Sequence, residues 1–150
     1  MKKIYLLFSF IICIAFFLCC NKINSSVSFA IAKKVSVGED TTITIANLTN
    51  FKWDKLYIFS PYANRESIEN TIGIKFLKEN DIQEYVSEGD TFLVFTKDDK
   101  VIHYFNHPRG KGDFSGYKDI KYFTPENAKF KVVHEGHNLY GKWPKLIIIK

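Results

Sequence analysis

The sequence predicts an α+β fold, in which an antiparallel sheet of about five to six strands carries one short helix on one face. Three observations support this prediction. Residues 91–105, TFLVFTKDDKVIHYF, place two β-rich runs on either side of two adjacent Asp residues, as in a hairpin with a tight turn. Residues 64–73 have the composition of a short capped helix, and the chain finishes with two further β-rich runs, 129–135 and 145–150.

The strands before the helix are predicted from their alternation. Residues 41–48, TTITIANL, alternate Thr with Ile, which is typical of a half-buried strand. Residues 54–60, DKLYIFS, are apolar on both faces, which favours a central strand covered on both sides. Pro61 follows this strand and should end it, because Pro has no ladder N–H to donate.

The helix is predicted from its end signals. Asn64 can cap its first turn, where Glu66 also lies, and Ile68 and Ile72 share one face. Gly73 suits the left-handed position just after the last helical residue.

The first segment, residues 1–20, has the pattern of an export signal. Lys2 and Lys3 precede an apolar run of 17 residues, Ile4 to Cys20, that contains no charge. Seventeen residues is also about the lower limit for a membrane-spanning helix, so an uncleaved N-terminal anchor and simple secretion are the alternatives. We expect residues 21–150 to lie outside the cytoplasm, in the cell envelope, because the two Lys hold the N-terminus inside.

The end of the apolar run resembles the lipobox of bacterial lipoproteins, in which a Cys after apolar and small residues is lipid-modified and becomes the mature N-terminus. That box has a small residue before the Cys. Here Cys19 precedes Cys20 and Leu18 precedes Cys19, so Cys20 is the better acceptor and Cys19 the alternative. The resemblance implies an anchor in the membrane through acyl chains, whose buried methylene groups give stable attachment.

After this leader we expect a tether over residues 21–40, polar at first and with an edge strand in its later part, and then a single α+β domain over residues 41–150. The chain's three Cys all lie within residues 1–20, so the domain should contain no disulfide, thiol nucleophile or Cys-based metal site.

The charge of the chain argues against nucleic acid as a partner. The net charge is +5, and it falls to about +3 without Lys2 and Lys3, with both signs spread along the chain. The stretch from Lys129 onward is locally basic, which leaves open a patch that faces anionic lipid headgroups or simply an exposed, solvated edge.

Two groups of residues are candidates for binding. The stretch 49–62, TNFKWDKLYIFSPY, is dense in aromatic residues and is either core or a pocket; the candidate pocket residues are Trp53, Asp54, Tyr57 and Tyr62. As a core residue, Asp54 would be expected to cap the neighbouring Thr49-Asn50 turn.

The second group lies in the Gly-rich stretch 109–116, RGKGDFSG, which we expect to form a mobile loop. Arg109, Lys111 and Phe114 are its candidate contacts with a protein partner. A phosphate-binding loop is not expected, because Lys111 is followed by Gly rather than by Ser or Thr at the start of a helix.

No catalytic residue, metal site or cofactor is predicted. His103 and His107 lie on or beyond a strand, where four residues span about 13 Å. His134 and His137, in HEGH, lack the spacing of a zinc protease and are expected in a turn at Gly136.

The residues FKWDKLYIFSPY, Phe51 to Tyr62, resemble a motif, F-x-W-D-x-x-Y-x-F-x-P-Y, of small bacterial lipoproteins and exported proteins of unknown function. In those proteins the motif precedes a short helix ending in Gly and then a strand hairpin. The resemblance covers about residues 41–106 and implies no activity. The sequence therefore predicts a membrane-anchored envelope lipoprotein with a non-enzymatic binding or structural role toward an envelope component. The alternative is an exported immunity or inhibitor protein that blocks a toxin or hydrolase.

Overall fold

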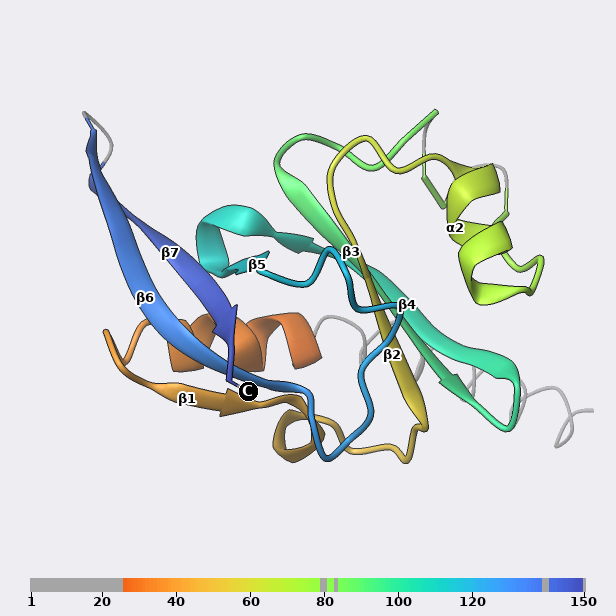
Figure 1. The fold of residues 1–150 in the computed structure, drawn as a ribbon, viewed down its shortest axis with the longest axis horizontal. Helices are drawn as coiled ribbons and strands as arrows, with labels where there is room; N and C mark the ends of the chain where they lie inside the picture. The colour runs from red at the N-terminus through yellow and green to blue at the C-terminus, as the bar shows by residue number, and fades with distance from the viewer. Residues whose placement is uncertain (1–25, 79–80, 83, 139–140, 150) are drawn as a thin grey trace, which may run out of the picture.

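The structure is a computed structural model that describes residues 26–78, 81–82, 84–138 and 141–149. These residues form an α+β fold with seven strands in two sheets and two helices, residues 26–35 and α2, Arg65–Ile72 (Figure 1). The strands are β1 Thr42–Thr44, β2 Lys55–Phe59, β3 Asp90–Lys97, β4 Lys100–Pro108, β5 Asp113–Ser115, β6 Lys129–Asn138 and β7 Gly141–Ile148.

The predicted α+β class is confirmed, and its strands divide into two sheets rather than one. A four-stranded sheet has the order β1-β6-β7-β5, and a three-stranded sheet has the order β2-β3-β4. All neighbouring strands are antiparallel except β5 and β7, which are parallel. The alternation of apolar and polar residues along a strand indicates which face is buried, but it does not indicate which strand is the hydrogen-bonded neighbour.

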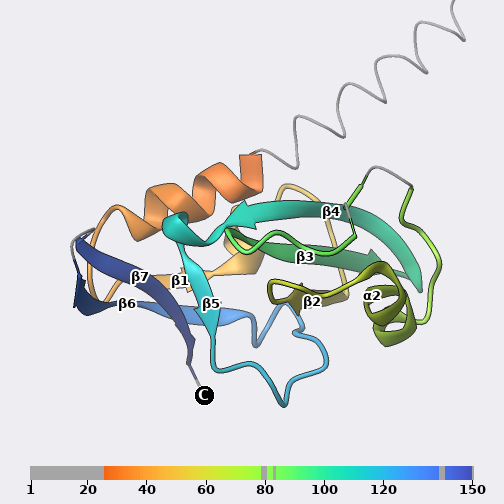
Figure 2. The same cartoon turned by 90° about the horizontal axis from the view of Figure 1, so that it is seen from above.

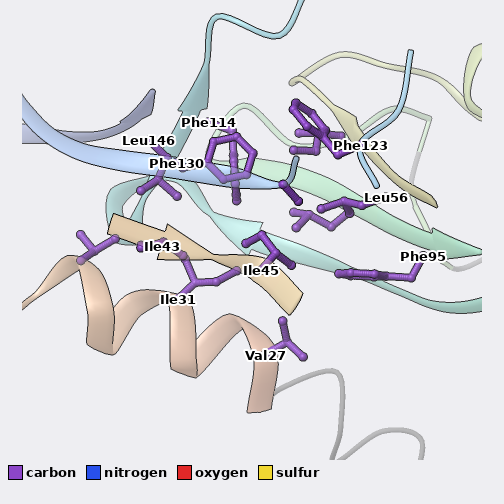
Figure 3. Packing of buried hydrophobic residues seen from close by; sticks show 14 of the residues in the cluster. Val27, Ile31, Ile43, Ile45, Leu56, Phe95, Phe114, Phe123, Phe130 and Leu146 are labelled. Carbon is purple, nitrogen blue, oxygen red and sulfur yellow. The ribbon is translucent and has the colours of Figure 1, made fainter. Parts of the chain in front are cut away.

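Residues 26–35 form a helix where the sequence predicted a tether and an edge strand. Val27, Ile31 and Val35 recur at every fourth position, and each is at most 6% exposed. Ile31 lies beside Ile43 of β1 and beside Ile45, which follows it in a 3-10 turn, Ile45–Leu48 (Figure 3). The helix is thus part of the domain, because its apolar face belongs to the core. Burial of this face stabilises the helix more than its intrinsic propensity does. The rest of the predicted tether, residues 21–25, lies outside the described part of the chain.

The α2 helix has the ends that the sequence predicts. The Asn64 side chain accepts a hydrogen bond from the Ser67 N–H at 2.8 Å, which caps the first turn. Gly73 has a left-handed backbone, with φ of 84°, and its N–H donates to the Glu69 carbonyl. Ile68 on the inner face is fully buried.

The predicted hairpin is β3 and β4, joined by Asp98 and Asp99. Both Asp have positive φ, 49° and 52°, as a two-residue type I′ turn requires. The register is regular from the Asp90–Pro108 pair to the Phe95–His103 pair and shifts after Phe95.

The three-stranded sheet has an apolar cluster on each face. Leu56 of β2 lies in the larger cluster, which is shared with helix 26–35 and the four-stranded sheet, while Tyr57 lies in the smaller cluster under α2. Figure 1 shows this sheet between α2 on one side and the four-stranded sheet with helix 26–35 on the other. The prediction that β2 is covered on both sides is therefore confirmed, but its place as the central strand was wrong. The central strand is β3. The edge strand β2 is also buried on both faces, because one apolar cluster covers each face of the sheet.

The last two strands pair as expected, with a different connection. The predicted turn at Gly136 is instead an irregular point within β6, where Gly136 has φ of 83°. The strand continues to Asn138 and pairs there with Gly141.

Candidate functional site

The aromatic stretch 49–62 does not form a pocket from its four candidate residues. Trp53 and Tyr57 are at most 5% exposed and belong to different apolar clusters, on opposite faces of the sheet. The Trp53 indole N–H donates to Thr49 Oγ1 at 3.1 Å. Tyr62 is 61% exposed and its ring meets that of Tyr85, so it lies apart from the other candidates.

Asp54 is exposed, and its carboxylate joins the stretch to the β3–β4 hairpin. Asp54 Oδ2 accepts a hydrogen bond from the backbone N–H of Asp98 at 2.8 Å, and the Asp54 N–H donates to the Thr96 carbonyl. The expected cap of the Thr49-Asn50 turn is therefore wrong. Asp54 instead holds a turn that lies 44 residues further along the chain. The sequence around Asp54 does not predict a partner so far along the chain.

An open hollow of about 430 Å³ lies at the end of this stretch, beside α2. Its wall includes Ile58, Phe59 and Ser60, which directly follow Tyr57, together with Tyr117 and the segment 118–121. Burial raises the pKa of Tyr117, and a hydrogen bond with Ser60 opposes that rise. The polar groups around the hollow include hydroxyl groups, the ammonium groups of two Lys and the carboxylate of Asp119. Sequence reasoning missed it, because Tyr117 reaches it from a segment with no regular structure.

A second hollow, of about 330 Å³, lies between the loop that follows α2 and β4, and Asp81 forms part of its wall. Asp81 in its wall accepts hydrogen bonds from the Tyr104 hydroxyl at 2.8 Å and from the Lys78 N–H at 2.6 Å. Burial, assisted by the bond to Asp81, raises the pKa of Tyr104 to about 12. These contacts fix the loop that follows α2 onto β4.

The stretch 109–116 is ordered into the fold, so the predicted mobile loop was wrong. Residues Arg109–Lys111 form a 3-10 turn and Asp113–Ser115 form β5. Arg109 makes a bidentate ion pair with Asp113, at 2.8 and 2.9 Å, and the Trp143 indole N–H donates to the same carboxylate at 3.0 Å. Phe114 is 4% exposed and packs edge-on against Phe130. Of the three candidate contacts, Lys111 alone remains exposed.

The chain passes from β4 of one sheet to β5 of the other through Gly112, which has little free space around it. Gly112 has φ of 137°, which side chains rarely adopt. A Cβ at this position would lie 3.1 Å from both Leu146 and Val35 and 3.4 Å from His107 Nε2. Glycine is therefore required where β4, β7 and helix 26–35 meet.

His103 and His107 contact different parts of the fold and do not form a common site. The His103 ring packs on Phe51 with centroids 4.1 Å apart, and burial lowers the pKa of His103. His107 is fully buried, and its Nδ1 shares a hydrogen bond of 2.8 Å with the hydroxyl of Ser28 on helix 26–35. Its Nε2 has no hydrogen-bond partner among the described residues. Burial lowers the pKa of His107 to about 4, although the nearby backbone of Lys111 and Gly112 opposes the shift.

Two of the lysines in the basic C-terminal stretch are paired with acids. Lys131 contacts Asp40 at 2.7 Å, and Lys145 contacts Glu135 at 2.5 Å. The positive charge of this stretch is thus partly neutralised within the fold.

The described residues contain no group of three or more His, Cys, Asp or Glu arranged to hold a metal ion. Within the same residues, no helix is both long and apolar enough to cross a membrane. The leader, with Cys19 and Cys20, lies outside the described part of the chain. Comparisons with protein-family models, curated proteins and solved structures found no match.

Proposed function

We propose that this chain is a bacterial lipoprotein, anchored in the membrane of the cell envelope, whose domain has a binding or structural role rather than a catalytic one. The observation that carries the proposal is the N-terminal sequence. Lys2 and Lys3 precede 17 uncharged, mostly apolar residues that end in Cys19-Cys20. The restriction of Cys to this leader supports it, because the remaining chain uses no Cys for packing or chemistry.

Metabolic labelling with an alkyne-bearing palmitate tests the anchor directly. We expect labelled full-length protein in the membrane fraction, loss of label in Cys20→Ala, and retention of label in the matched control Cys19→Ala. Label that survives both substitutions would overturn lipidation at this position. An unlabelled chain in the culture medium would overturn anchoring as a whole.

The binding role is tested by cross-linking the anchored protein in intact cells, followed by purification and identification of cross-linked proteins. We expect one envelope component to be recovered repeatedly. Recovery of none would contradict a binding role.

The inhibitor alternative has less support from the geometry. It depends on an exposed contact loop, but Phe114 is buried and Arg109 is held by Asp113. We therefore propose the envelope role alone.

A further inference from the structure

The outer face of helix 26–35 combines apolar exposure with positive charge. Phe29 is 71% exposed, although it lies between the buried residues Val27 and Ile31. Lys33 follows Phe29 by four residues and therefore shares its face, whereas Lys34 is exposed on the flank of the helix, beside the buried face. Val37, in the turn just after the helix, is 72% exposed. An aromatic side chain beside lysines is typical of helices that lie in a membrane interface.

The lysines of this helix are not neutralised by acidic side chains among the described residues. Neither Lys33 nor Lys34 forms an ion pair with another described residue, whereas Lys131 is paired with Asp40. Glu39 and Asp40 follow the helix and oppose an anionic surface at that end, but the pairing of Asp40 with Lys131 offsets part of this charge. Two unpaired ammonium groups on one exposed helix complement anionic lipid headgroups.

The position of the helix in the chain limits its distance from the anchor. Five residues, 21–25, separate Cys20 from Ser26, the first described residue. Six residue steps span at most about 20 Å even when fully extended. Phe29 lies one helical turn beyond Ser26. Figure 2 shows the helix as an outer layer, with the four-stranded sheet beneath it and the three-stranded sheet to one side, so no strand covers its outer face.

We propose that the outer face of helix 26–35 rests on the anionic lipid surface of the membrane that holds Cys20, with Phe29 in the interface and Lys33 and Lys34 against the headgroup phosphates. This inference rests on the proposed lipid anchor. It adds an orientation, because contact through this helix turns α2 and the hollow at Tyr117 toward the space away from the bilayer.

Brominated lipids provide the test, because they quench tryptophan fluorescence at contact distance. The lipidated full chain carrying Phe29→Trp is reconstituted into phosphatidylcholine vesicles with and without phosphatidylglycerol. The signal of the parent protein, which contains Trp53 and Trp143, is subtracted. The matched control is Tyr122→Trp, at a side chain that is 39% exposed. It lies in the segment 116–128, which Figure 2 shows on the side opposite helix 26–35.

We expect the tryptophan at position 29 to shift its emission to shorter wavelength and to be quenched in anionic vesicles, while that at position 122 is not. Adding Lys33→Glu and Lys34→Glu should reduce the quenching several-fold without releasing the chain from the vesicles. A chain that floats with the vesicles but shows no quenching at position 29 overturns this inference alone. A chain that does not float with membranes overturns the proposed anchor. A blue shift that appears with rising protein concentration and without lipid would show that a second copy covers this face, and would also overturn the inference.

Discussion

Ser28 Oγ and His107 Nδ1 lie 2.8 Å apart and join helix 26–35 to the end of β4. His107 is fully buried, packs edge-on against Phe114, and lies next to the backbone of Gly112. The charge of Lys111 acts on the ring and also disfavours a charged imidazole. The neutral form of His107 is therefore the form that the fold requires.

This requirement predicts a loss of stability in acid. The folded protein binds a proton at His107 only near pH 4, whereas the unfolded chain binds it at the ordinary His pKa of about 6.5. The contribution of neutral His107 is complete above pH 6.5 and is lost as the pH falls to 4, by on the order of 3 kcal/mol in the free energy of unfolding. Urea denaturation at several pH values measures it. His107→Gln should flatten the loss over this range, and the matched control His134→Gln should not. Equal pH profiles for the parent and His107→Gln would contradict the prediction.

Asp54 is expected to act on stability through the hairpin turn. Asp54→Ala removes the acceptor of the Asp98 N–H and should lower the free energy of unfolding by about 0.5–1.5 kcal/mol. Asp54→Asn keeps an acceptor oxygen and should cost less. Chemical denaturation of the two variants compares them directly. If both changes cost the same, the charge rather than the hydrogen bond would be the important property.

Gly112→Ala should be far more damaging than an ordinary glycine substitution. The added Cβ meets Leu146 and Val35 at 3.1 Å in a backbone conformation that disfavours any side chain. Together these effects should cost roughly 2–4 kcal/mol. Gly89→Ala is the control, because the nearest atom to its Cβ is 4.0 Å away, and it should change stability by less than about 0.5 kcal/mol. Thermal unfolding of both variants measures the contrast, and similar midpoints would show that the crossing at Gly112 is not tightly packed.

Substitutions of Phe114 and Lys111 test whether each residue of the stretch 109–116 belongs to the core or to an exposed surface. Phe114→Ala should lower the free energy of unfolding by roughly 3–5 kcal/mol, because it empties a buried site against Phe130. Lys111→Ala, at an exposed position, should stay within about 0.5 kcal/mol of the parent. Denaturation curves give both values. A stable Phe114→Ala protein would restore the possibility that Phe114 faces a partner.

Elements with local signals could be predicted from the sequence. The α2 helix is determined by Asn64 and Gly73 at its two ends, and the β3–β4 hairpin by a two-Asp turn between β-rich runs. In both cases the residues that determine the element lie within or beside it. Helix 26–35 had a signal of the same kind in Val27, Ile31 and Val35, but its Ser and Asn neighbours suggested a spacer.

Features that depend on distant contacts could not be predicted. β5 pairs with β7 across about thirty residues, in parallel, so the stretch 109–116 looks like a Gly-rich loop when considered alone. Asp54 finds its partner 44 residues away, and Ser28 meets His107 across 79 residues. In each case the partner is set by the packing of the two sheets, which local composition does not encode.

If the chain is exported as proposed, the pairing of β1 with β6 sets the order in which its sheets can form. Thr42 lies opposite Lys131, and β7, the strand that joins β6 to β5, extends to Ile148 near the end of the chain. A chain that crosses a membrane from its N-terminus delivers β1 early, but it delivers β6 and β7 late. The β3–β4 hairpin can form early, since its strands are adjacent, but the larger sheet can close only after nearly the whole chain has emerged. For the proposed export, such late closure would keep the polypeptide unfolded until its passage through the membrane is complete.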